Sequence, residues 1–296
     1  MYLISTKILA VLTLIEHVNV GTGILSNLVL LYLIVKFSRE NMGTYKYLLI
    51  TFASYDIFLT IVHALCNQQI VIVNITTFAA YVTCLFCASY SIPFTLILIH
   101  FLYRYWAIQN PDRIVLFTRK PFIALLVAFC GTVYMIWFCL VFFGFTGAPG
   151  DESVRLARAE YFRRYGRDIK HGWVVGEHWK DGKFNLRPAL VLLALDSILI
   201  FLIILATVIC VITLNHIAKT EAFSAYTKVL HTKLLQTLVV QTMTPVLLVY
   251  TPYILKLTLP FLGIPEYGSM AACTALNSAF PTFDAVIIGT MINDYR

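Results

Sequence analysis

Residues 188–214 read PALVLLALDSILIFLIILATVICVITL, a run in which Asp196 is the single charged residue. A helix needs roughly 20 apolar residues to cross the hydrocarbon core of a bilayer, so this run is long enough to do so. The rest of the chain has a similar character, with 59% hydrophobic residues, 12% charged residues and a mean hydropathy of +0.81. A water-soluble domain could not cover this much apolar surface. The composition therefore predicts a membrane protein.

Six other runs match it in character. We expect the seven membrane-spanning helices over Ile8–Val35, Tyr47–Asn67, Ala79–Tyr105, Pro121–Phe143, Pro188–Leu214, Leu234–Leu257 and Ser269–Ile292. A transmembrane β-barrel would need alternating strands of about 10 residues, whereas these runs are longer and do not alternate. The sequence therefore predicts an all-α membrane protein in which residues 1–296 form a single seven-transmembrane helix bundle.

The basic residues of the short connections predict the direction of the bundle. The first, third and fifth connections are basic, whereas the second has no Lys or Arg and the sixth has only Lys256 at its rim. Short basic loops stay cytoplasmic, so we expect the amino terminus outside and the carboxyl terminus inside. The connection at about 144–187 is long and of mixed charge, and it falls outside. The net charge of +7 follows from these loops and needs no nucleic acid.

Three acidic residues lie inside predicted spans, where an ionisable group is costly and usually functional. Asp56 and Asp284 both fall in the inner half of the membrane, judged from the helix rise. If the second and seventh spans are neighbours, the two carboxyl groups could share a proton or a cation and act as a conformational switch. The alternative is a polar core in which Asp56 is hydrogen-bonded to Ser54 or Asn27. The third acid, Asp196, lies in the outer half.

Arg104 stands at the inner end of the third span, within the run His100-Phe101-Leu102-Tyr103-Arg104-Tyr105. Two interpretations fit this position. Arg104 is either a snorkelling anchor in a belt of interfacial aromatic residues, or a switch that turns toward a cytoplasmic partner when the helices separate.

Prolines interrupt the sixth span at Pro245 and Pro252. Proline removes a helix hydrogen bond and kinks the helix, which suits a hinge beside a basic inner loop. Irregular packing is the alternative, and Pro93 and Pro281 carry the same ambiguity.

The outer half of the bundle contains mostly apolar side chains with a few polar groups, which is the usual composition of a small-molecule pocket. The candidate ligand-binding residues are Cys87, Tyr90, Ser91, Asp196, Tyr250, Thr251, Asn277 and Phe280. The alternative is packing for the aromatic members and pairing with a neighbouring helix for Asp196. Asn74 opens an Asn-Ile-Thr sequon on the outer side and is a candidate glycosylation site. The seven histidines are scattered over both sides, so we expect no metal, and no motif indicates a cofactor.

Several motifs in order resemble one family of receptors. They are Met42–Ile50 with Tyr55–Phe58, His100–Tyr105, Leu234–Thr242 with Pro245 and Tyr250–Pro252, Phe280–Asp284, and Ile292–Arg296. The set resembles the nematode seven-helix chemoreceptors of serpentine receptor class r (the Str family, which contains the diacetyl odorant receptor) or a sister class, over essentially the whole chain. The resemblance implies that His100, Tyr103, Arg104 and Tyr105 lie at a G-protein-coupling face. Tyr103 departs from the rhodopsin-like pattern, which has an acid before the arginine, so an adjacent ionic lock is absent.

These features favour a chemosensory, olfactory G-protein-coupled receptor. It would bind a small external molecule in the outer half of the bundle and activate a heterotrimeric G protein, and the resemblance implies a place in the plasma membrane of sensory cilia. A seven-helix ligand-gated channel or transporter is the alternative, although an odd helix number without a visible repeat argues against inverted-repeat transporters. No HExxH or GxSxG motif is present, so we do not expect an enzyme.

Overall fold

The computed structural model of the protein describes residues 6–37, 43–72, 79–145, 152–165, 168, 179–180, 183–221, 224–262 and 269–293. Asn74 lies outside these residues. The elements in chain order are α1 (Thr6–Phe37), α2 (Tyr45–Ile72), α3 (Ala79–Ser89), α4 (Ile92–Gln109), the 3₁₀-helix η3 (Pro111–Thr118), α5 (Lys120–Phe145), α6 (Glu152–Tyr165), β1 (Trp179–Lys180), β2 (Lys183–Phe184), α7 (Leu186–Lys219), α8 (Ala225–Pro245), the π-helix η4 (Val246–Tyr250), α9 (Thr251–Thr258), the 3₁₀-helix η5 (Leu259–Leu262) and α10 (Ser269–Asn293).

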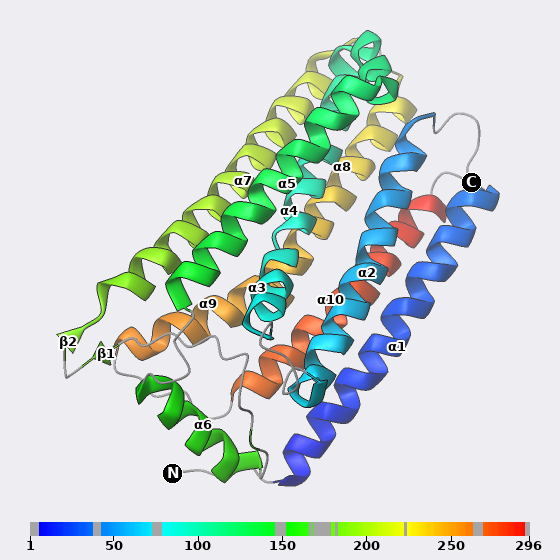
Figure 1. Ribbon diagram of the computed structural model, residues 1–296. Helices are drawn as coiled ribbons and strands as arrows, with labels where there is room; N and C mark the ends of the chain where they lie inside the picture. Colours follow the sequence, from blue (N-terminus) through cyan, green and yellow to red (C-terminus); the bar gives the residue numbers. More distant parts are fainter. Residues whose placement is uncertain are drawn as a thin grey trace.

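The long helices lie side by side in one bundle, whose two ends differ (Figure 1). We call one the η3 end, where η3 joins α4 to α5, and the other the α6 end, where α6 lies across the bundle. Six segments are long and apolar enough to cross a membrane: Ala10–Lys36, Tyr45–Cys66, Tyr81–Gln109, Lys120–Phe145, Leu186–Lys219 and Ala225–Leu255. The seventh helix, α10, has 25 residues and includes Asn277 and Asp284. The predicted all-α seven-helix bundle is confirmed.

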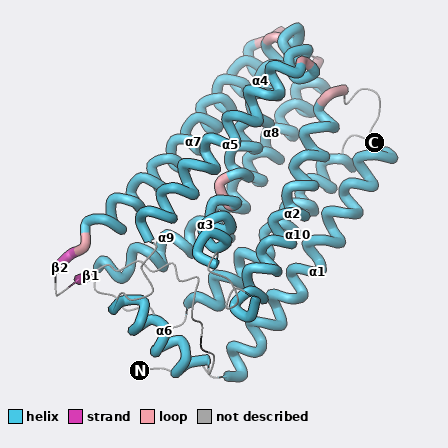
Figure 2. Tube along the Cα trace, viewed as in Figure 1, coloured by secondary structure: helices cyan, strands magenta, loops and turns pink. Residues whose placement is uncertain are grey.

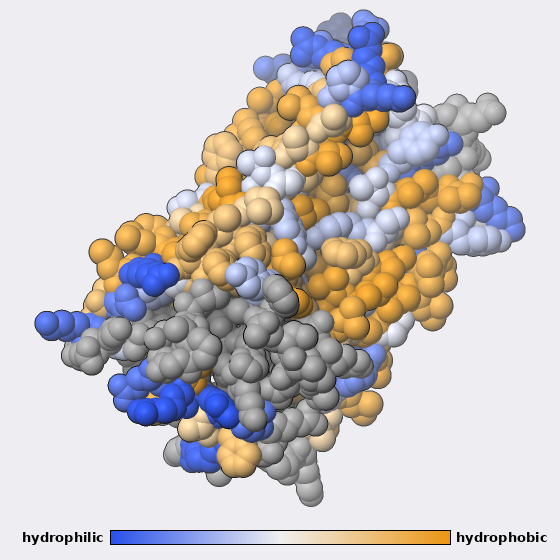
Figure 3. All heavy atoms as spheres, viewed as in Figure 1, coloured by the Kyte–Doolittle hydropathy of each residue, from blue (hydrophilic) through white to orange (hydrophobic). Residues whose placement is uncertain are grey.

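The surface of the bundle agrees with a membrane setting. On the face shown in Figure 3, apolar side chains cover much of the side of the bundle, whereas the strongly hydrophilic side chains gather toward its ends. On the sides of the bundle Leu125, Leu193 and Phe201 are 63%, 62% and 64% exposed. Such large apolar side chains are favoured outside only where the surroundings are apolar too.

The helix α4 occupies the centre of the bundle. It contacts α2, α5, α7 and α8, and every residue from Ile92 to Phe101 is buried. This segment is apolar around most of its circumference, which is the pattern of a helix enclosed by others. The side chains of α4 consequently dominate the main hydrophobic core.

The third span is broken, which differs from the single helix predicted over Ala79–Tyr105. A turn at Tyr90–Ser91 separates α3 from α4 (Figure 2). The cause is Pro93, which has no N–H to donate to the carbonyl of Ser89, four residues earlier. The Tyr55 hydroxyl of α2 donates to that carbonyl instead, at 2.7 Å. A side chain from the neighbouring helix thus satisfies the acceptor that the proline leaves open.

The sixth span changes helix type between its two prolines. The helix α8 ends at Pro245, the π-helix follows over Val246–Tyr250, and Pro252 sits in the first turn of α9. The N–H of Thr251 reaches back five residues to the carbonyl of Val246. The predicted interruption is therefore present as a π-turn, a feature frequent at functional sites.

The predicted outer loop at about 144–187 contains secondary structure in its described part. The helix α6 lies there, and β1 pairs antiparallel with β2 through Trp179 and Phe184. Both lie at the α6 end (Figure 1). Near the two ends of this connection α5 and α7 approach closely, since a Cβ on Gly144 would overlap Val191.

Candidate functional site

A polar cluster joins three helices toward the α6 end of the bundle. Glu16 of α1 accepts from His63 Nε2 of α2 at 2.9 Å, and His63 Nδ1 lies 2.9 Å from the Tyr90 hydroxyl at the α3–α4 turn. One neutral tautomer of His63 satisfies both contacts, with the proton on Nε2 and Nδ1 accepting from Tyr90. The His63 side chain is 3% exposed and that of Glu16 is 12% exposed. The cluster therefore ties α1 and α2 to the break in the third span.

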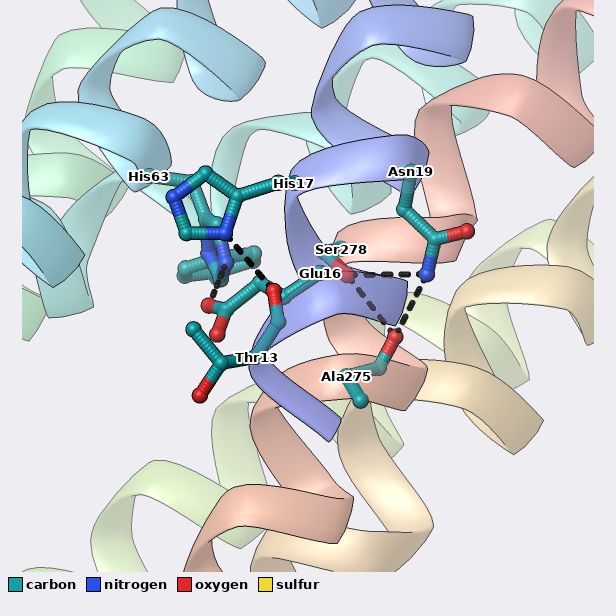
Figure 4. Close-up of polar contacts among 8 residues, drawn as sticks. Thr13, Glu16, His17, Asn19, His63, Ala275 and Ser278 are labelled. Carbon is teal, nitrogen blue, oxygen red and sulfur yellow. Dashed lines mark hydrogen bonds and ion pairs between the residues drawn. The ribbon is translucent and has the colours of Figure 1, made fainter. Parts of the chain in front are cut away.

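A second contact joins α1 to α10 beside this cluster. Figure 4 shows Glu16 facing His63 and Asn19 facing α10. The Asn19 amide donates to the carbonyl of Ala275 and to the hydroxyl of Ser278, both at 3.0 Å. Together the two contacts hold α1, α2, the α3–α4 turn and α10 around one polar centre.

A small cavity of about 10 Å³ lies at this centre. Its lining residues are Val20, Leu59, Thr60, His63, Tyr90, Asn277, Ser278 and Pro281. The volume is close to that of one water probe. The Asn277 side chain lies beside the hydroxyls of Tyr90 and Tyr253, yet both its amide atoms lack a well-formed hydrogen bond among the described residues. Asn277 is thus a buried polar group that can accept a further partner.

The structure divides the predicted ligand-binding residues into separate groups. Tyr90 and Asn277 line the cavity, and Ser91 and Phe280 are fully buried near them. Cys87 is half-buried against a smaller core cluster of α3, α5 and α7.

Asp196 and Tyr250 form a separate pair, because the Tyr250 hydroxyl donates to the Asp196 carboxylate at 3.0 Å. Thr251 is exposed and its hydroxyl bonds back to Val246, so its predicted place in the pocket is wrong. The π-turn is the reason, because its additional residue turns the following residues around the helix axis.

Sequence reasoning missed Glu16, His63 and Asn19. A signal was present in Glu16, since an ionisable residue inside an apolar span is a functional candidate by default. Its partner could not be found in the same way, because His63 is far from it along the chain and the pairing depends on how α1 and α2 pack.

A buried carboxyl pair lies at mid-bundle. The Asp56 carboxyl of α2 lies near that of Asp284 of α10, and both are fully buried; neither Asp56 oxygen has a well-formed hydrogen bond among the described residues. Gln241 of α8 donates to Asp284 at 3.2 Å. The structure thus brings together the two acids expected to meet. The alternative partners are wrong, because Ser54 is exposed and the Asn27 amide donates to the carbonyls of Gly23 and Pro281.

Arg104 lies buried near the η3 end, with 7% of its surface exposed. Its guanidinium carbon is 3.8 Å from the centre of the Tyr45 ring, on the first turn of α2. His100 and Tyr103 are buried beside the same ring, at centroid distances of 5.6 Å and 5.2 Å, and Tyr105 is half-buried. The snorkelling interpretation requires an arginine head group at the surface, and this conformation contradicts it.

Within the described ranges, no three His, Cys, Asp or Glu side chains are placed to hold a metal ion. The polar groups instead form three layers along the core: the cluster around Glu16 and His63, the carboxyl pair, and the arginine over Tyr45. Each layer joins helices that are distant in the sequence.

Comparison with known proteins places these features in a family. Residues 12–296 match the protein family described as "Serpentine type 7TM GPCR chemoreceptor Str". The chain is 24% identical to serpentine receptor class r-10 of Caenorhabditis briggsae, over 91% of this chain and 84% of that protein. It is 22% identical to G-protein coupled receptor str-33 of Caenorhabditis elegans, over 93% of this chain and 86% of that protein. With a match over nearly its whole length, the chain belongs to the Str family of serpentine seven-transmembrane chemoreceptors.

Proposed function

We propose that this multi-pass membrane protein is a chemosensory receptor that binds a small external molecule near the Glu16–His63–Tyr90 cluster and activates a heterotrimeric G protein at the η3 end. The observation that carries the proposal is the series of three polar layers that runs through the core from one end to the other. In this proposal the amino terminus and the α6 end face outward, and the protein resides in the plasma membrane of sensory cilia. Asn74, if glycosylated, would carry its glycan on the outer side.

Ligand binding near the cluster is supported by the state of the cavity. Its volume of about 10 Å³ is too small for an odorant, so entry requires α1, α2 and α10 to move apart around it. A ligand that gives Asn277 a hydrogen-bond partner and replaces a contact of His63 favours the conformation in which these helices are rearranged. It shifts the population only as far as it binds that conformation more tightly than the closed one.

Transmission toward the η3 end is supported by the connections of the cluster. Tyr90 sits at the α3–α4 turn, and the neighbouring Ser89 carbonyl is held by Tyr55, the residue before Asp56. The Asp56–Asp284 pair, which shares one proton or a cation, is the proposed switch, because two adjacent negative charges in an apolar core repel each other. The π-turn between Pro245 and Pro252 supplies the proposed hinge in α8 and α9.

Arg104 is the proposed contact with the G protein. The test expresses the chain with a G-protein reporter and applies a panel of small volatile and weakly polar molecules, comparing Arg104→Ala at matched surface expression. We expect ligand responses in the native chain and their loss in the variant. Normal signalling by Arg104→Ala would reject the role of this arginine, whereas a ligand-gated current that persists without G protein would reject the receptor itself in favour of a channel.

A further inference from the structure

One side chain that holds Arg104 in its buried position can be identified from the contacts at the η3 end. The residue before Arg104 is Tyr103, so the position that holds an acid in rhodopsin-like receptors has no charge. The guanidinium covers the face of Tyr45 at 3.8 Å, well inside the limit of about 6 Å for a cation–π contact. Such contacts are strongest where both groups are removed from water, and Tyr45 is only 2% exposed.

The Tyr45 ring is fixed in place by its neighbours. The turn before α2 contains Gly43 in the left-handed conformation (φ 52°), and it sets Tyr45 as the first residue of the helix. The ring makes a T-shaped contact with His100 and a tilted contact with Tyr103, both of α4. The adjacent Thr44 hydroxyl lies 3.1 Å from that of Tyr103. The ring therefore presents one face to Arg104 without freedom to turn away.

We propose that Tyr45 is a positioning residue, an aromatic latch that keeps Arg104 buried in the resting receptor. Separation of α2 from α4 removes the ring from the guanidinium and frees the arginine for its partner. The latch acts through the π-face of the ring, so it does not need the tyrosine hydroxyl. The inference rests on the proposed function for the role of the freed arginine, but not for the contact itself.

The test measures the opening of the η3 end directly in the full chain. Spectroscopic labels at two exposed positions, Thr51 of α2 and Val115 of η3, report the distance between α2 and the segment that follows α4. Tyr45→Leu removes the π-face, and we expect the ratio of open to closed molecules to rise roughly 5- to 30-fold. Tyr45→Phe keeps the face and is expected to restore the closed distance. The matched control is Tyr47→Leu, an exposed tyrosine of the same helix turn that contacts Lys46.

A second series guards against a folding defect in Tyr45→Leu. Fluorinated phenylalanines at position 45 keep the shape of the ring and weaken its π-face in steps. The latch predicts a graded rise in the open fraction with each added fluorine. An unchanged distance distribution across this series, or the same opening in Tyr47→Leu, would overturn the proposal.

The G-protein reporter is read in parallel with the distances. Opening in Tyr45→Leu together with raised basal signalling supports both the latch and the proposed function. Opening in a silent reporter supports the latch and contradicts G-protein coupling, so the two failures are distinguishable.

Discussion

Tyr55→Phe removes one hydroxyl, and we expect its effect on stability to depend on the presence of Pro93. In the native chain the Tyr55 hydroxyl donates to the Ser89 carbonyl at 2.7 Å, which Pro93 leaves without its helical donor. A typical hydrogen bond contributes about 0.5–1.5 kcal/mol and an unsatisfied buried acceptor costs about 1–3 kcal/mol. Side-chain hydrogen bonds measured in a membrane protein average about 0.6 kcal/mol with a maximum near 1.7. We therefore expect Tyr55→Phe to lower the free energy of unfolding by about 1 kcal/mol.

Pro93→Ala supplies the matched background. Ser91 already has helical dihedral angles (φ −78°, ψ −26°), so the N–H of an alanine at position 93 can reach the Ser89 carbonyl. The Tyr55 hydroxyl is then not needed, and Tyr55→Phe in the Pro93→Ala background is expected to leave the free energy of unfolding nearly unchanged. The quantity to measure is the coupling free energy of this double-mutant cycle, about 1 kcal/mol.

Thermal unfolding in detergent provides the assay, followed with a thiol-reactive dye that reaches the buried Cys84 and Cys210 only on unfolding. A loss of about 1 kcal/mol corresponds to a fall in Tm of roughly 2 °C for a chain of this size. Equal costs of Tyr55→Phe in the two backgrounds would refute the account of the break, because the hydroxyl would then act independently of the proline.

Three further variants test other contacts. Gly144→Ala places a methyl against Val191 and should lower the free energy of unfolding by about 1–3 kcal/mol. The double variant Gly144→Ala/Val191→Ala should recover this stability. No recovery would mean that α5 and α7 do not meet at these residues. Glu16→Leu leaves His63 without its acceptor; because an unpartnered buried polar group costs about 1–3 kcal/mol, dose–response curves should show responses to active molecules weakened roughly tenfold or more. Glu16→Gln keeps an acceptor and should weaken these responses less. Equal curves for the native chain and the variants would show that the cluster is not part of the ligand site. Asp284→Leu removes the acceptor of the Gln241 amide and the carboxyl that lies near Asp56. It should reduce folded receptor at the cell surface several-fold, with Asp284→Asn closer to native by flow cytometry. Identical levels would show that the pair is not part of the packed core.

The architecture could be predicted from the sequence because its signals are local. A span reveals itself by its own apolar length, as residues 188–214 do, and an acid such as Asp56 is conspicuous in any apolar run. The sequence also predicted the meeting of Asp56 and Asp284, because both lie at a similar depth in the membrane. Only the adjacency of the second and seventh spans had to be assumed.

The details of the site depend on contacts between distant segments, which no local pattern shows. The pairing of Glu16 with His63 requires the relative rotation of α1 and α2. The face of Thr251 depends on the π-turn before it, which proline positions alone do not specify. The arginine latch likewise needed the structure, because Tyr45 is adjacent to Arg104 only through the packing of α2 on α4.

The central claim is that this bundle passes a signal to a heterotrimeric G protein through its η3 end. The most direct measurement uses the purified full chain in lipid nanodiscs and follows nucleotide exchange on the G protein, with Arg104→Ala as control. We expect the native chain to accelerate exchange, and to do so further with an active molecule from the panel, whereas the variant does not. No acceleration by the native chain, together with a molecule-gated current from the same protein in a planar bilayer, would contradict it.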